Sequence, residues 1–178
     1  MNTKTPCTSS RQSTVKGNKG KTCRAPYYGD VLKRKKENDK LRIIFQNING
    51  LGTSKENDKR EVLREYINKY KVDCYALAEI NINWKVVPTK ESLHTFFKDS
   101  FQHSKTTVSH NVWGNTKHPH QQGGVGIITV GDMALRVSGS TQDSKKLGRW
   151  TSTAIRGSNN MITRIVSVYV PRVPTGSS

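Results

Sequence analysis

The segment Leu41-Arg-Ile-Ile-Phe-Gln-Asn-Ile-Asn-Gly-Leu51 is where the chain first takes on the composition of a folded core. Its β-branched and aromatic residues are typical of a β-strand, and the Asn49-Gly50 pair favours a tight turn directly after it. We therefore expect a strand that begins near Leu41 and ends near Asn47.

Helical periodicity follows this turn. Between residues 55 and 71, apolar side chains recur at helical spacing, at Val62, Leu63, Tyr66, Ile67 and Tyr70. Thr53 and Glu56 match a capping box at the start of that helix. Residues 74–78 (CYALA) are continuously apolar, which favours a strand covered on both faces. The order strand, helix, strand predicts an α/β fold.

Strand signals dominate the remainder of the chain. A second helix is expected over residues 91–100, with Thr89 as its N-cap. The strand signals after it lie at residues 106–113, 124–130, 134–137, 149–155 and 162–170.

Residues 1–40 have a different composition from the rest. They are rich in Ser, Thr, Asn, Gly and Lys and poor in aliphatic side chains, so we expect a disordered tail in front of a domain at residues 41–178. The tail has 11 basic and 3 acidic side chains, a net of +8, and the remaining +9 of the chain's formal charge of +17 lies in the domain. Such a charge attracts polyanions, which makes a nucleic acid, DNA above all, the expected partner.

Four consecutive basic residues are candidate nucleic-acid contacts or a nuclear import signal, with a solvated basic arm as the alternative. They are Lys33, Arg34, Lys35 and Lys36.

The three cysteines show no zinc-ligand spacing, and no apolar run approaches the roughly 18 residues of a membrane span. The start of the chain lacks the apolar segment of a secretory signal. We expect an intracellular protein without a membrane partner, and a nuclear one if the basic run is an import signal.

Four short motifs occur in one order along the chain: Gln46-Asn-Ile-Asn-Gly-Leu51, Ala76-Leu-Ala-Glu79, Gly123-Gly-Val-Gly-Ile-Ile128 and Val168-Tyr-Val-Pro171. Together they resemble the endonuclease/exonuclease/phosphatase family, and within it the abasic-site endonucleases and the endonuclease domains of non-LTR retrotransposons. The resemblance spans residues 41–172. It implies the N-terminal part of a four-layer α/β sandwich, mainly one sheet with helices on its outer face.

The resemblance implies a role for one residue in each of three motifs. Asn47 would contact the phosphate or the water shell of the metal, Glu79 would bind Mg²⁺ (or Mn²⁺), and Tyr169 would hydrogen-bond the scissile phosphate. Each has a structural alternative: an Asn that satisfies a turn, a solvated strand end and a packed aromatic ring. Two positions depart from the family pattern, since Ala78 replaces the usual Gln and Arg172 the usual Asn.

Other candidates have less support from the pattern. His118 and His120 could bind a metal but are more typical of a plain loop. Arg149 is a candidate nucleic-acid contact, as are Trp84, Trp113 and Trp150 through stacking, with core packing or strand-end exposure as the alternative.

The family completes its site with a Gly-Asp-x-Asn motif and a late Asp-His pair, and neither follows Tyr169. The resemblance therefore implies a truncated Mg²⁺-dependent phosphodiesterase or DNA endonuclease domain of retroelement origin, and whether this chain is itself an enzyme stays open. The alternatives are a non-catalytic, basic nucleic-acid-binding remnant and an inert fragment. Since an incomplete sandwich leaves a sheet face uncovered, we expect aggregation, a homo-oligomer or a missing C-terminal half.

Overall fold

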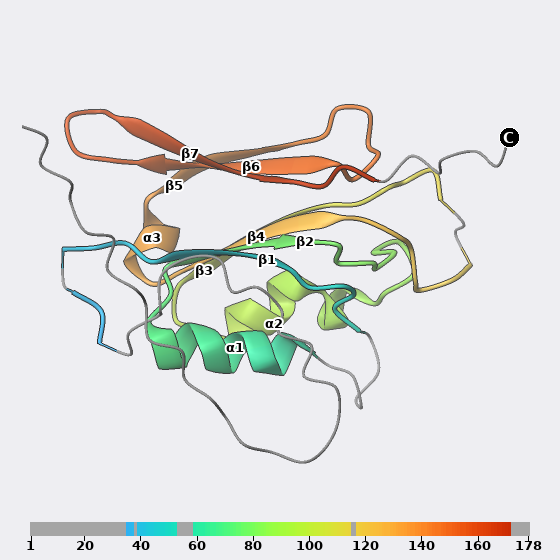
Figure 1. Cartoon of the computed structure of the whole chain (residues 1–178), viewed down its shortest axis with the longest axis horizontal. Coiled ribbons are helices and arrows are strands. Elements are labelled where there is room, and N and C mark those ends of the chain that lie inside the picture. The colour runs from blue at the N-terminus through green and yellow to red at the C-terminus, as the bar shows by residue number, and fades with distance from the viewer. Residues whose placement is uncertain (1–34, 38, 53–58, 115–116, 172–178) are drawn as a thin grey trace, which may run out of the picture. The chain divides into compact units, whose positions relative to one another are not determined.

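The computed structural model describes residues 35–37, 39–52, 59–114 and 117–171 (Figure 1). All of them belong to the unit Leu32–Ser178, and the fold below is the fold of this unit. Most of the predicted tail lies outside the described residues, as do the predicted capping box at Thr53 and Glu56 and the departure at Arg172.

The first sheet contains four strands in the order β1-β2-β4-β3. β1 (Ile43–Asn47) runs parallel to β2 (Cys74–Ala78), and helix α1 (Lys59–Tyr70) lies between them in sequence. β4 (Val125–Val130) is antiparallel to both β2 and β3 (Ser104–Ser109). The strands predicted at Leu41–Asn47 and at residues 74–78 are confirmed, as is the helix within residues 59–70.

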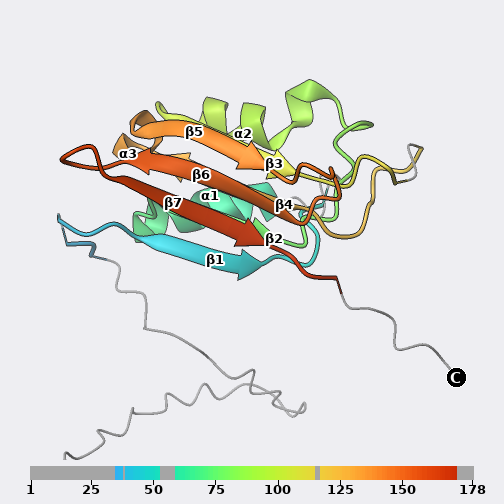
Figure 2. The ribbon, with the colours of Figure 1, turned by 90° about the horizontal axis from the view of Figure 1, so that it is seen from above.

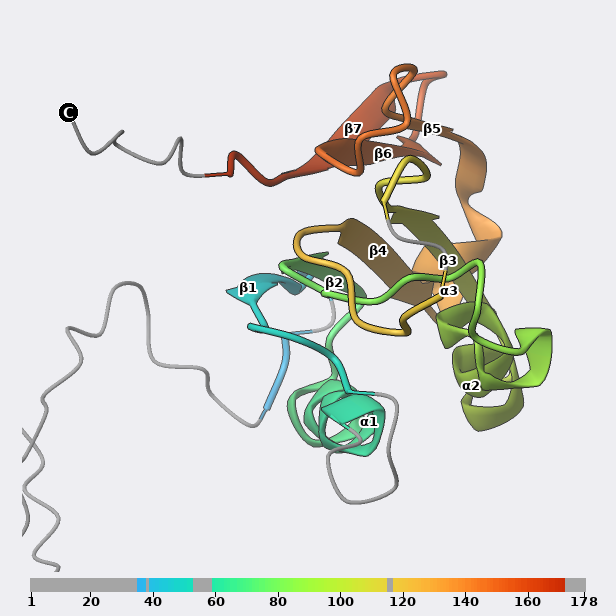
Figure 3. The same ribbon diagram turned by 90° about the vertical axis from the view of Figure 1, so that its right-hand side faces the viewer.

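Two helices cover one face of this sheet (Figures 1 and 3). α1 buries Leu63 and Ile67 against it, and α2 (Leu93–Ser100) buries Leu93 and Phe97. The predicted cap at Thr89 is wrong. Thr89 begins a short 3-10 helix (Thr89–Glu91), and the extended Ser92 caps α2 by accepting a hydrogen bond from the N–H of Thr95.

The opposite face packs against a second, antiparallel sheet of three strands in the order β5-β6-β7 (Figure 3). Its strands are β5 (Val137–Gln142), β6 (Trp150–Arg156) and β7 (Ile162–Val168). Between the sheets lies an apolar cluster of Cys74, Ala76, Ile127, Met133 and Ile155. The structure thus has three successive layers: the helices α1 and α2, the first sheet and the second sheet. This confirms the α/β sandwich.

The strand predicted at residues 134–137 is wrong. Residues Asp132–Leu135 form the short helix α3, because Gly131 (φ 59°) turns the chain at its start, and β5 begins only at Val137. The sequence of β5, VSGSTQ, has one apolar residue, so it carries no apolar alternation that would predict a strand. The strand predicted over 106–113 is shorter and earlier, at Ser104–Ser109.

Apolar side chains remain exposed on one side of the sandwich. The edge strands there are β1 of the first sheet and β7 of the second (Figure 2). On β1, 58% of Phe45 is exposed, and on β7 about half of Val166 and of Val168. The second sheet covers β2 and β4, so the uncovered surface is narrower than the whole sheet face. Within the described part of the chain, none of the helices has the length and apolar character needed to cross a membrane.

Candidate active site

Three strands of the first sheet have termini that lie together at one end of the sheet. Asn47 at the end of β1 is paired with Ala78 at the end of β2, and Ala78 is paired in turn with Val125 at the start of β4. Tyr169 directly follows β7 of the second sheet and lies at the same end of the sandwich. Its N–H donates to the carbonyl of Arg149 at 2.7 Å. These ends enclose a cleft of about 480 Å³, lined by Asn49, Glu79, Asn81, His120, Gln122, Tyr169 and Val170.

Backbone hydrogen bonds hold the turn after β1 against the segment after β2. The N–H of Gly50 donates to the carbonyl of Glu79 at 2.7 Å, and the N–H of Leu51 donates to that of Ile80 at 2.8 Å. Asn49, Glu79 and Asn81 all adopt left-handed backbone conformations, with φ of 46°, 55° and 56°. Such conformations cost about 1–2 kcal/mol for a residue with a side chain and gather at functional sites. All three residues line the cleft.

Asn81 fixes the segment that precedes β4. Its N–H donates to the carbonyl of Gly123 at 2.7 Å, and its Oδ1 accepts from the N–H of Gly123 at 2.8 Å. Gly123 in turn lies against Tyr169, because a Cβ on Gly123 would be 3.1 Å from Cε1 of that ring. Asn81 is a cleft residue that the sequence analysis missed. An Asn two positions after the expected metal ligand was the available signal.

The structure brings two of the three expected site residues together, since Glu79 and Tyr169 line the same cleft. Asn47 is exposed and is not among the residues that line it. Its Oδ1 accepts a hydrogen bond from the N–H of Asn49 at 3.1 Å, so its amide supports the turn. Asn49, which we expected only to support the turn, is the one that lines the cleft.

A second hollow of about 500 Å³ shares Asn49, Asn81 and His120 with the cleft. His118 also lines it, and the rings of the two histidines lie with their centroids 6.5 Å apart. Lys59 also lines this hollow, and its Nζ donates to the carbonyls of Ile48 at 2.7 Å and Asn49 at 3.1 Å. The ammonium group of Lys59 therefore braces the turn that carries Asn49.

Of the basic candidate nucleic-acid contacts, Lys35, Lys36 and Arg149 lie within the described residues. Lys33 and Arg34 lie outside the described residues, and Lys35 is exposed. Lys36 binds both carboxylate oxygens of Asp73, at 2.5 and 2.6 Å. Arg149 is exposed, and its carbonyl accepts a hydrogen bond from the N–H of Tyr169.

The three tryptophans differ in exposure. Trp84 packs against the main apolar core, Trp150 at the start of β6 is partly buried, and Trp113 is 75% exposed.

The donor atoms of the cleft fit a hard cation such as Mg²⁺. Glu79 supplies a carboxylate, and Asn49 and Asn81 supply amide oxygens, while Mg²⁺ needs few protein ligands because it retains several waters. Within the described part of the chain, His, Cys, Asp and Glu side chains do not gather in groups of three that could hold a metal tightly. The cleft therefore offers oxygen ligands for a loosely held cation.

Comparisons with known proteins identify the fold. No protein-family model and no curated protein sequence matches the chain. Among solved structures, the 3′ phosphatase NExo from Neisseria, bound to a product DNA hairpin, superposes with a TM-score of 0.50 at 13% identity, over 73% of this chain and 41% of that one. An AP endonuclease from Archaeoglobus fulgidus has a TM-score of 0.47 at 18% identity, over 74% of this chain and 42% of that one.

A protein of the endonuclease/exonuclease/phosphatase family from Leptotrichia buccalis has a TM-score of 0.48 at 14% identity, over 74% of this chain and 54% of that one. The superposition on the Neisseria enzyme shows that the chain has the endonuclease/exonuclease/phosphatase fold, and the chain spans less than half the length of that enzyme. At such identities the likeness concerns the fold, and function depends on the site.

Proposed function

We propose that the cleft at the ends of β1 and β2 is the metal- and phosphate-binding part of a Mg²⁺-dependent phosphodiesterase site that acts on nucleic acid. The observation that carries this proposal is the meeting in one cleft of Glu79 and Tyr169, which directly follow strands of different sheets. The DNA hairpin bound to the Neisseria enzyme and the charge of +17 both support DNA as the substrate. The motif resemblance supports an origin in a retroelement endonuclease.

The cleft residues would have different roles, because their side chains differ in chemistry. The carboxylate of Glu79 and the amide oxygens of Asn49 and Asn81 would hold Mg²⁺, which supplies positive charge next to a phosphodiester. The phenol of Tyr169 would donate a hydrogen bond to a phosphate oxygen, where it stabilises charge that grows in the transition state. The brace from Lys59 keeps the turn, and with it Asn49, in place.

A second candidate function is nucleic-acid binding without cleavage. The observation that favours it is that Glu79 is the single carboxylate among the residues that line the cleft. With that carboxylate on the metal, His120 is the one other lining side chain that could act as a general base for the attacking water. Binding would then rest on the basic surface and weaken steeply with salt.

A plasmid-nicking assay with the whole chain separates the two functions. We expect Mg²⁺-dependent nicking that is lost in Glu79→Gln and retained in Glu65→Gln, an exposed carboxylate on α1 that serves as the matched control. Salt-sensitive binding of the plasmid with no nicking by any variant would instead support the second function. Equal nicking by Glu79→Gln and the unchanged chain would overturn the assignment of Glu79.

A metal-binding measurement tests the site without reference to activity. Mn²⁺ broadens the NMR signals of nuclei near it, so titration should first broaden the amide signals of residues 79–81 and 49–50. Glu79→Gln should remove this selective broadening, whereas Glu65→Gln should leave it unchanged. Broadening centred elsewhere would contradict a cation site in this cleft.

A further inference from the structure

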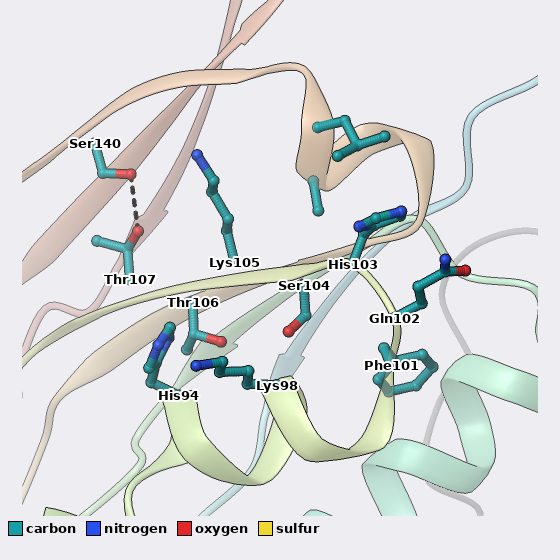
Figure 4. Close-up of a pocket in the computed structure, with 12 residues that line it drawn as sticks. His94, Lys98, Phe101, Gln102, His103, Ser104, Lys105, Thr106, Thr107 and Ser140 are labelled. Atoms are coloured by element: carbon teal, nitrogen blue, oxygen red, sulfur yellow. Dashed lines mark hydrogen bonds between the residues drawn. The ribbon is translucent and has the colours of Figure 1, made fainter.

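A separate pocket lies at the other end of the first sheet. In the register of β3 with β4, Ser109 pairs with Val125 at the cleft end, and Ser104 pairs with Val130 at the far end. The two ends are about 17 Å apart along a strand of this length. A cavity of about 430 Å³ opens at the far end, between α2, the edge strand β3 and α3 (Figure 4). We call it the β3-edge pocket.

The β3-edge pocket is lined by basic side chains. His94 and Lys98 come from α2, and His103 and Lys105 from the start of β3 and the residue before it. Its lining contains no Asp or Glu, and none of these four side chains forms an ion pair with another described residue. Lys98 lies on the α2 side of β3, and Lys105 lies on the opposite side, towards Ser140 (Figure 4). The positive charge of Lys98 in a concave, partly apolar surface attracts an anion.

Two hydroxyl groups in the same pocket have no partner. Ser104 Oγ and Thr106 Oγ1 are shielded from solvent and form no hydrogen bond. Strand alternation puts both on the α2 side of β3, where Figure 4 shows them beside His94 and Lys98. On the other side, Thr107 donates to Ser140 at 2.9 Å, so its hydroxyl group is satisfied within the protein.

An unpaired, shielded hydroxyl group costs about 1–3 kcal/mol, which makes a pair of them unusual in a region built only for packing. Both lie under exposed side chains of a helix, His94 and Lys98, which change rotamer easily. A small rotation of Lys98 would open a space in which an oxygen-rich anion meets two hydroxyl donors, an ammonium group and an imidazole.

We propose that the β3-edge pocket binds a phosphate group. The phosphate oxygens would accept hydrogen bonds from the hydroxyls of Ser104 and Thr106 and from the Nζ of Lys98, with His94 beside them. The phosphate could belong to a phosphorylated small molecule or to the backbone of a nucleic acid. This site stands apart from the candidate active site, and it does not depend on the function proposed for that cleft.

Calorimetric titration of the whole chain with inorganic phosphate, at constant ionic strength, tests the site. We expect saturable binding of one phosphate that Lys98→Gln weakens by about tenfold, the usual effect of losing one charged hydrogen bond. Lys90→Gln, which removes the same charge from an exposed position outside the pocket, should leave the affinity unchanged. Equal weakening by both substitutions, or the absence of saturable binding, would overturn the proposal.

Thr106→Val tests the site independently of charge, because it removes a hydroxyl group and leaves the electrostatic attraction for an anion unchanged. Valine keeps the shape of the side chain and removes a hydroxyl that has no partner in the free protein. We therefore expect an unchanged or higher melting temperature together with a weaker affinity for phosphate. A Thr106→Val variant that binds phosphate as tightly as the unchanged chain would contradict the role of this hydroxyl group and so the proposed site.

Two further ligands distinguish the source of the phosphate. A nucleoside 5′-monophosphate whose binding falls about tenfold in Lys98→Gln, with duplex DNA unaffected, would assign the pocket to a phosphorylated small molecule. A similar fall for both would assign it to the backbone of a nucleic acid. No fall for either ligand, with inorganic phosphate also unaffected, would refute the site.

Discussion

Asn81 and Gly123 exchange two hydrogen bonds: the N–H of Asn81 donates to the carbonyl of Gly123 at 2.7 Å, and the N–H of Gly123 donates to Oδ1 of Asn81 at 2.8 Å. This pair joins the end of β2 to the segment that enters β4. Because the ring of Tyr169 packs on Gly123, the same pair also sets one wall of the cleft.

Gly123→Ala should disturb Tyr169 as well as the backbone. At φ 89° any side chain is strained, and the added Cβ would lie 3.1 Å from the tyrosine ring. Gly131→Ala is the matched control, since Gly131 also has a positive φ (59°) but has no atom near its missing Cβ. We expect each substitution to lower the free energy of unfolding by about 1–2 kcal/mol in a urea titration.

Only Gly123→Ala should shift the ring carbon signals of Tyr169 in NMR spectra of tyrosine-labelled protein. The Tyr169→Phe variant identifies these signals. An equal shift in both glycine variants would contradict the contact between Gly123 and Tyr169.

Asp143→Ala should destabilise the loop that joins β5 to β6. The carboxylate of Asp143 is buried and accepts hydrogen bonds from the N–H groups of Lys145, Leu147 and Arg149 at 3.0, 3.1 and 3.3 Å. Removal of a charged acceptor from three donors should cost about 2–3 kcal/mol in the free energy of unfolding. Asp99→Ala, an exposed carboxylate on α2, is the control and should change it by less than about 0.5 kcal/mol.

His110 should make the protein less stable in mild acid. Burial, and then the positive charge of Lys85, lower the pKa of His110 below its ordinary value of 6.5. The folded state thus prefers the neutral ring, so the stabilisation is complete above pH 6.5 and is lost as the pH falls through the ordinary pKa towards the lowered one. Urea titrations from pH 7.5 to 5 should therefore show a steeper loss of stability for the unchanged protein than for His110→Gln.

Lys85→Gln separates the two causes, because it removes the charge and leaves the burial. We expect it to reduce the difference in pH dependence between the unchanged protein and His110→Gln. Identical pH profiles for the unchanged protein and His110→Gln would contradict the lowered pKa.

Cys74 should be unreactive in the folded protein. Only 1% of this residue is exposed, and burial, together with the nearby charge of Asp73, raises the pKa of its thiol to about 12. Because the thiolate is the reactive form, alkylation by iodoacetamide at pH 7.5 should be on the order of a thousandfold slower than in denaturant. Peptide mass spectrometry reports on Cys74 alone, and rapid labelling without denaturant would show that β2 is accessible.

The first half of the described fold could be predicted from its sequence because its signals are local. The helical spacing of Leu63 and Ile67 and the continuous apolar run of β2 each identify an element without reference to the rest of the chain. β5 could not be predicted in this way. Its polar residues form a strand only because β6 pairs along it, and pairing between strands is a property of the assembled sheet.

The candidate site shows the same division. The motifs around Asn47, Glu79 and Tyr169 were recognisable in the sequence, and the chemistry of a carboxylate and a phenol follows from the residue types. Which Asn amide lines the cleft was decided by the turn after β1, where Asn47 accepts from Asn49 and leaves Asn49 to line the cleft. Such a choice depends on backbone geometry that one sequence does not reveal.

The opening strand and its Asn-Gly turn were thus determined by the sequence alone, since β-propensity and turn chemistry act within a few residues. The tertiary structure alone brought Glu79, Asn81 and Tyr169 into one cleft and put two unpaired hydroxyl groups beneath His94 and Lys98. The cleft joins residues that are distant in sequence, and the β3-edge pocket joins a helix to the strand that follows it. Their positions follow from strand register and from the packing of one layer on another, and these are set only when the whole unit folds.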